Sequence, residues 1–154
     1  MGIERLSDIL RPESVLTPLG AETRDTAIAE LIGALDLPGT PADIQAFSQA
    51  VLAREEAGST GIGNGVAIPH ARSPRIAKPI LAAGLSPRRI DFSSADGKPA
   101  SLVFLLAVPE SSPASHLKIL AALSRVSSDK KLLRSLNAAA NARELYDRLA
   151  PIAV

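Results

Sequence analysis

The sequence has 154 residues, of which 46% are hydrophobic and 21% charged, and this suits one globular domain with a buried core. Its 17 basic and 16 acidic side chains nearly cancel and only 3% of its residues are aromatic, so it lacks the basic field and the stacking surface of nucleic-acid-binding proteins. The absence of cysteine excludes disulfides, thiolate metal sites and cysteine nucleophiles. No uncharged apolar run approaches the roughly 18 residues of a membrane span, and the N terminus has no signal-peptide core. We therefore expect a cytoplasmic protein that neither binds nucleic acid nor inserts into a membrane.

The first third of the chain is predicted to be mainly helical. Residues 3–10 predict a short helix and residues 14–16 a brief strand. Over residues 23–37, apolar side chains recur at i, i+3, i+4 and i+7, which is the spacing of an amphipathic helix. A further helix begins after Thr40, which can cap it, and ends just before Gly58. We expect Gly58 to take the left-handed conformation that ends many helices.

Strands dominate the middle of the chain. Residues 66–68 and 80–85 have the length and composition of strands. The segment "SLVFLLAV" (101–108) is apolar on both faces, as expected for the central strand of a covered sheet. Residues 91–99 carry the Gly, Pro and Asp of a turn or an exposed connection.

Three helices are predicted to close the chain. The first runs over residues 112–126, with its serine as the cap and a proline at its first position. Ser128 and Asn141 are placed to cap the last two, and Asn141 with Glu144 fits a capping box. Helices and strands are mixed along the chain without a linker. We therefore predict one α/β domain over residues 1–154, with a central mixed sheet of about five strands flanked by helices on its faces.

The run "GSTGIGNGVAIPHAR" (58–72) leads from a glycine-rich loop into a short strand and then to Pro69 and His70. Because proline fixes its own φ and restricts the residue before it, the imidazole of His70 is expected at a strand end with little backbone freedom. Glycines let the backbone approach a ligand, and successive amides can bind an anion. An imidazole nucleophile beside such amides suits phosphoryl transfer. The candidate phosphate-binding residues are Ser59, Thr60, Gly61, Gly63 and Asn64.

The same run also has a purely structural interpretation, because a glycine-rich segment before a strand is often only a turn. It is not a P-loop, since Gly-Lys-Ser/Thr is missing. No predicted strand precedes it, as the dinucleotide-binding fingerprint would require. The motif therefore gives no support for a nucleotide cofactor.

His116 and Arg54 are the other candidate site residues. His116 falls about one turn into its predicted helix, where the positive end of the helix dipole disfavours imidazolium and attracts phosphate. The alternative is a structural histidine at the edge of the buried face. Arg54 is either a solvated residue near a helix end or a planar clamp for phosphate oxygens. Glu55 and Glu56 are interpreted as surface charges, and two histidines without cysteine are too few for a convincing metal site, so no metal is predicted.

The segment "REEAGSTGIGNGVAIPHAR" (54–72) closely resembles the active-site signature of the fructose/mannitol-type enzyme IIA domains of the bacterial phosphotransferase system. The resemblance extends over almost the whole chain and includes "SHLKILAALSRV" (115–126) and "ARELYDRL" (142–149). Within the family, the sequence is most similar to the nitrogen-regulatory IIA proteins. Ala71, at a position where glycine is common, is a small departure from the pattern.

The resemblance implies that His70 accepts phosphate through its Nε2 atom from a histidine-containing phosphocarrier protein. It implies that His116 is the second active-site histidine, that Arg54 is the arginine beside it, and that no metal or nucleotide cofactor is used. The leading hypothesis is a regulatory phosphocarrier whose phosphorylation state controls partner proteins such as transporters or kinases. An alternative is a sugar-transport IIA that passes phosphate to a separate fructose or mannitol IIB domain. A third hypothesis is a hydrolase with the two histidines as an acid–base pair, although no orienting carboxylate is identifiable.

Overall fold

A six-stranded mixed sheet organises residues 2–154, the part of the chain that the computed structural model describes. The strands lie in the order β1-β5-β6-β3-β2, and β4 pairs with β6 further along the β3 edge. β5 is antiparallel to β6, whereas β3 and β4 are parallel to it. The predicted mixed sheet is confirmed, with six strands because residues 58–73 supply three short ones. The strands are β1 (Leu10–Leu16), β2 (Gly61–Gly63), β3 (Val66–Ala67), β4 (His70–Ser73), β5 (Ile80–Ile90) and β6 (Ala100–Pro109).

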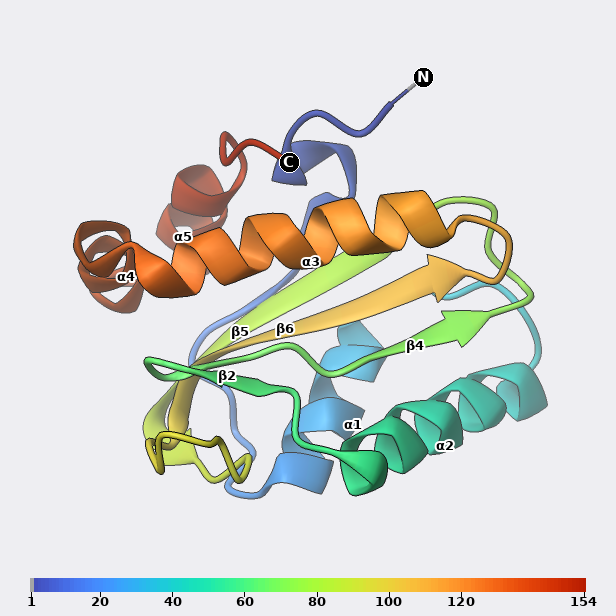
Figure 1. Ribbon diagram of the computed structural model, residues 1–154, viewed down its shortest axis with the longest axis horizontal. Helices are drawn as coiled ribbons and strands as arrows, with labels where there is room; N and C mark the ends of the chain where they lie inside the picture. Colours follow the sequence, from blue (N-terminus) through green and yellow to red (C-terminus); the bar gives the residue numbers. More distant parts are fainter. Residues whose placement is uncertain (1) are drawn as a thin grey trace.

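Helices cover both faces of this sheet, which gives the three layers visible in Figure 1. One face carries α1 and α2, and the other carries α3, α4, α5 and a single turn of 3₁₀ helix, η1. The α/β domain with helices on both faces is therefore confirmed. The helices are η1 (Leu6–Asp8), α1 (Arg24–Ala34), α2 (Pro41–Ala57), α3 (Pro113–Ser128), α4 (Lys130–Asn137) and α5 (Ala142–Leu149).

Strand β6 is buried on both faces, as its continuous apolar run predicts. Phe104 and Leu106 pack into the hydrophobic cluster beneath α3–α5, whereas Val103 and Leu105 pack against α1 and α2. All four side chains are fully buried. Because successive side chains of a strand point to opposite faces, one apolar segment can supply both cores.

Two of the predicted helix caps are confirmed by their hydrogen bonds. The hydroxyl of Thr40 accepts a hydrogen bond from the Asp43 backbone N–H at 3.2 Å, and the Asp43 carboxylate accepts one from the Thr40 N–H. The Asn141 side chain accepts from the Glu144 N–H at 2.9 Å. The Glu144 carboxylate turns to the N–H of Ala140 instead of that of Asn141, so this capping box is shifted by one residue.

Two predictions at helix ends are wrong, and a third is confirmed only in its position. Asp129, and not Ser128, caps α4, because Ser128 belongs to the last turn of α3 and its hydroxyl donates to the carbonyl of Ser124. Ser112 occupies the cap position of α3, but its side chain makes no capping hydrogen bond. Gly58 has a φ of 168°, which is extended backbone and not the left-handed conformation.

The predicted helix over residues 3–10 is also wrong in extent. Only the single turn of η1 forms, and Leu10 begins β1 by pairing in parallel register with Leu81 of β5. Residues 14–16 do form a strand, but as the end of this longer one. The helical spacing of the apolar residues is therefore overridden by the backbone hydrogen bonds that β5 offers to this segment.

Candidate active site

His70 begins β4 at one edge of the sheet, where its register partner is Leu106 of β6. The next residue, Ala71, packs into the cluster under α1 and α2. Because side chains alternate along a strand, His70 and Arg72 lie on the opposite face, which α3 covers. Strand β4 lies between α3 and α2 (Figure 1), and the His70 side chain at its start is half-buried.

The protonation of His70 is set by the backbone just before it. Its Nδ1 atom lies 2.7 Å from the carbonyl oxygen of Ile68. A carbonyl only accepts hydrogen bonds, so Nδ1 carries the proton and the neutral ring has its free lone pair on Nε2. Burial lowers the pKa of His70, while the Ile68 carbonyl opposes this and the charge of Arg54 adds to it. The ring is therefore neutral near pH 7, with a nucleophilic Nε2.

His116 lies beside His70, as a shared site requires. The two rings meet edge to face, with 5.1 Å between their centroids and 65° between their planes. The Nε2 atom of His116 is buried and has no hydrogen-bond partner among the described residues. Burial also lowers the pKa of His116, and the nearby His70, Arg72 and Arg54 lower it further. A buried polar atom without a partner is costly, and a group transferred to His70 could provide that partner.

Two arginines stand near the histidine pair. Arg54, in the last turn of α2, donates from Nη1 to the carbonyl of Gly58 at 2.6 Å. Its positive charge contributes to the lowered pKa of both histidines. Arg72 influences His116 in the same way and was not among the predicted site residues. The alternation of β4 could have identified it, since Arg72 follows His70 by two residues.

Glu55 is buried, with only 4% of its surface exposed, so its interpretation as a surface charge is wrong. Its carboxylate accepts the backbone N–H of Thr60 at 3.2 Å and also the Thr60 hydroxyl. Burial raises the pKa of Glu55, partly offset by the Thr60 N–H. The carboxylate therefore fixes the glycine-rich loop to the end of α2, and the neighbouring Glu56 remains at the surface in an ion pair with Arg24.

The other predicted loop donors are largely engaged within the protein. The Ser59 hydroxyl donates to the Phe92 carbonyl and accepts from the N–H of Gly61 at 2.9 Å. A side chain at Gly61 would collide with the hydroxyl of Ser94, so this glycine allows a close approach within the protein. Gly63 has a φ of 92°, which favours glycine at this turn.

Asn64 lies far from the histidine pair. Its side-chain amide donates to the carbonyl of Ser127 at 2.9 Å, in the last turn of α3. His116 is near the start of the same helix, roughly 16 Å away at 1.5 Å of rise per residue. The backbone N–H of Asn64 donates to the Asp96 carboxylate at 2.9 Å. The structure thus brings His116 to His70, and it places Asn64 at the opposite end of α3.

Residues 2–154 lack the features of two other kinds of site. None of the helices there combines the length and apolar character needed to cross a membrane. The same residues bring together no group of three or more histidine, acidic or cysteine side chains that could hold a metal ion.

The sequence and the fold match proteins of one family. Residues 8–151 match the family described as "Phosphoenolpyruvate-dependent sugar phosphotransferase system, EIIA 2". A nitrogen regulatory protein of Bradyrhizobium diazoefficiens is 38% identical over 146 residues and 94% of each chain. The fructose-specific EIIA component of Haloferax volcanii is 34% identical over 152 residues and 99% of each chain. The crystal structure of the nitrogen regulatory protein IIA-Ntr from Neisseria meningitidis superimposes with a TM-score of 0.85 at 31% identity, covering 94% of this chain and 99% of that one. This chain therefore belongs to the EIIA 2 family of the phosphoenolpyruvate-dependent sugar phosphotransferase system.

Proposed function

We propose that this protein is a phosphocarrier that accepts a phosphoryl group on Nε2 of His70 from a histidine-containing phosphocarrier protein and regulates partner proteins by its phosphorylation state. The observation that carries the proposal is the hydrogen bond between His70 Nδ1 and the Ile68 carbonyl. It directs the free lone pair to Nε2, and burial keeps the ring unprotonated near pH 7. Membership of the EIIA 2 family supports phosphoryl transfer as the chemistry.

The transfer step is a displacement at phosphorus. Nε2 of His70 attacks the phosphorus of the donor's phosphohistidine, the bond from phosphorus to the donor ring breaks, and the bond to Nε2 forms. The His70 ring takes up the positive charge that the departing ring loses. Because the Ile68 carbonyl oxygen accepts a hydrogen bond from Nδ1–H, it stabilises this charge as it develops.

His116 and Arg54 would hold the transferring group. The ring centroids of His116 and His70 are 5.1 Å apart. The buried Nε2 of His116, which has no hydrogen-bond partner among residues 2–154, can donate to a phosphoryl oxygen when it carries the proton. Arg54 donates one N–H to the Gly58 carbonyl, which fixes the guanidinium. Its other N–H groups can then donate to phosphoryl oxygens. In this proposal the two side chains stabilise the charge on the equatorial oxygens during transfer.

A sugar-transport role is the second candidate, in which the phosphoryl group passes from His70 to a fructose- or mannitol-type IIB domain. It is favoured by the 34% identity with the fructose-specific EIIA component of Haloferax volcanii over nearly the full length of both chains. The regulatory role is favoured by the higher identity, 38%, with the nitrogen regulatory protein of Bradyrhizobium diazoefficiens.

The acceptor is tested by incubating the protein with phosphoenolpyruvate, enzyme I and the phosphocarrier protein. We expect one acid-labile phosphoryl group on the wild type by intact mass spectrometry, and none on His70→Ala. Phosphorus NMR of the labelled protein should show attachment at Nε2. Label that survives in His70→Ala, or attachment at Nδ1, would contradict the assigned acceptor.

The two roles are separated by adding purified fructose- and mannitol-type IIB domains to the phosphorylated protein. A regulatory protein should keep its label for much longer than the transfer from the phosphocarrier takes. Rapid passage of the label to a IIB domain would instead support sugar transport.

A further inference from the structure

A cleft of about 1030 Å³ lies at the far end of α3, away from His70. Its walls come from the end of β5, the connection between β5 and β6, the tip of the β2–β3 hairpin, and helix α4. Asn64 belongs to this wall, and its bond to the Ser127 carbonyl ties the hairpin to the end of α3. Neither His70 nor His116 is among the residues that line the cleft.

Four cationic side chains line this cleft, and none of its lining residues within 2–154 is acidic. Lys130 and Arg134 are one helical turn apart on α4, while Arg89 and Lys98 come from the end of β5 and from the connection that follows it. Like charges four residues apart weaken a helix slightly, so an anion between the walls would offset this repulsion. The charge on the cleft thus points to an anionic ligand.

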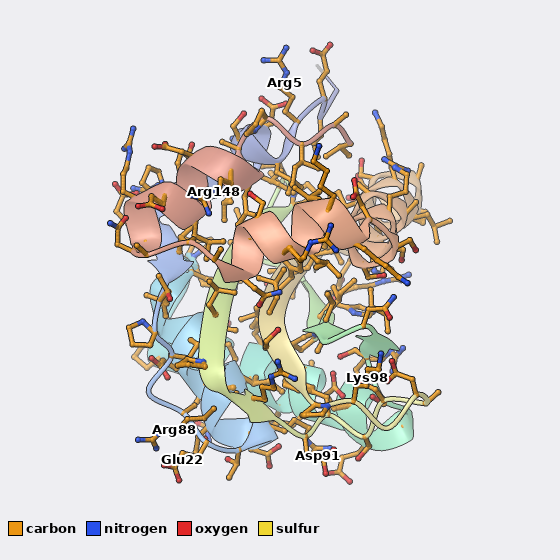
Figure 2. All side chains as sticks on the ribbon, turned by 90° about the vertical axis from the view of Figure 1, so that its left-hand side faces the viewer. Arg5, Glu22, Arg88, Asp91, Lys98 and Arg148 are labelled. Atoms are coloured by element: carbon orange, nitrogen blue, oxygen red, sulfur yellow. The ribbon has the colours of Figure 1, made fainter. Side chains whose placement is uncertain are left out.

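Ion pairs in this region leave the four cations available. Arg88 pairs with Glu22 on α1's side of the sheet, and Figure 2 shows these two side chains together, apart from Lys98. Its neighbour Arg89 makes no ion pair within the described residues, and neither do Lys98, Lys130 or Arg134. The sequence places two adjacent arginines here, and the fold neutralises only one.

Two further observations indicate a built site. Ser86 lines the cleft, and only 1% of its surface is exposed. Its hydroxyl has no hydrogen-bond partner among residues 2–154. Arg89 has a φ of 53°, an unfavourable conformation for a residue with a side chain, at the irregularity in the β5–β6 pairing. Strained residues of this kind gather where the surrounding structure positions a functional side chain.

The rest of the lining is mixed, with apolar residues such as Pro87, Pro99 and Leu133 beside polar ones such as Ser101 and Asn137. A cleft of this volume and mixed character suits a small molecule, since ligand sites combine apolar walls with a few polar groups. We propose that this cleft binds a small organic anion with at least two neighbouring negative charges, such as a nucleoside diphosphate. Its charged groups would lie between Lys130 and Arg134 on one side and Arg89 and Lys98 on the other.

The test uses the full chain labelled with ¹⁵N and three probes: ADP, pyrophosphate and citrate. We expect saturable shifts of the backbone amide signals of Lys98 and Lys130 with at least one probe, and weaker binding as salt increases. In the double variant Lys130→Gln/Arg134→Gln, the dissociation constant should rise about tenfold or more, because two charged contacts are lost.

The matched control is Lys131→Gln, which removes the same charge from the next residue of α4, outside the cleft lining. It should bind like the wild type, and circular dichroism should show that all variants fold. Two results would overturn the proposal: no saturable shift with any probe at millimolar concentration, or an equal loss of affinity in the control.

Discussion

The side chains near the two ends of helix α3 differ in charge and in burial. At the start of the helix, His70 and His116 are half-buried, and burial lowers the pKa of both so that they stay neutral. Just beyond its end, Lys130 and Arg134 of α4 are exposed and have no acidic partner in the cleft lining. A nucleophile needs an unprotonated, partly desolvated ring, whereas an anion-binding site needs cations that remain charged in water. One helix thus separates a site suited to covalent chemistry from one suited to reversible binding.

The largest expected effect falls at the histidine end. In His116→Ala, we expect transfer from the phosphocarrier to His70 to slow by about 100-fold, because one donor to the phosphoryl oxygens is lost. The rate is measured by rapid-quench sampling of the labelled protein. His116→Gln keeps an amide donor and should recover part of the rate. Unchanged rates in His116→Ala, in both directions of transfer, would make His116 a structural residue only.

A smaller effect is expected for Arg54→Lys. Lysine keeps the charge but cannot reproduce the planar fork, so we expect transfer to slow by about threefold to tenfold. Arg143→Lys is the control, since Arg143 belongs to another helix, α5, is exposed, and forms an ion pair with Asp147 one turn later. The same quench experiment applies to both. Wild-type transfer by the Arg54 variant would remove the guanidinium from the proposed site.

The smallest effect concerns stability against pH. Since the folded pKa of both histidines lies below the ordinary value of 6.5, the unfolded chain binds more protons as the solution is acidified. The free energy of unfolding should therefore be constant above pH 6.5 and fall below it. In His70→Gln/His116→Gln, this fall should be shallower, as urea unfolding at about pH 7.5 and about pH 5.5 would show.

Glu55 changes the free energy of unfolding with pH in the direction opposite to that of the histidines. Burial raises its pKa, so protonation of Glu55 favours the folded state as the pH falls. Its contribution is present in the wild type and in the histidine double variant, and it cancels when the two are compared. Equal slopes in the two proteins would show that the histidines are not held neutral by burial.

Much of this protein follows from the sequence alone, because the determining signals are local. The apolar run of β6 predicts a strand covered on both faces, and the cap at Thr40 predicts where α2 begins. The segment around His70 is predicted in the same way, since Pro69 restricts, and the glycines before it free, only the neighbouring backbone. These features depend on side-chain periodicity and on hydrogen bonds between residues close in the chain.

Only the tertiary structure decided which distant groups meet. It buried Glu55 against Thr60, brought His116 to His70, and carried Asn64 to the opposite end of α3. Residue type and spacing specify a helix face or a strand face, but the pairing register of the sheet fixes which faces come together. The sequence therefore identified the nucleophile candidate, whereas the composition of its surroundings and the cationic cleft depended on long-range packing.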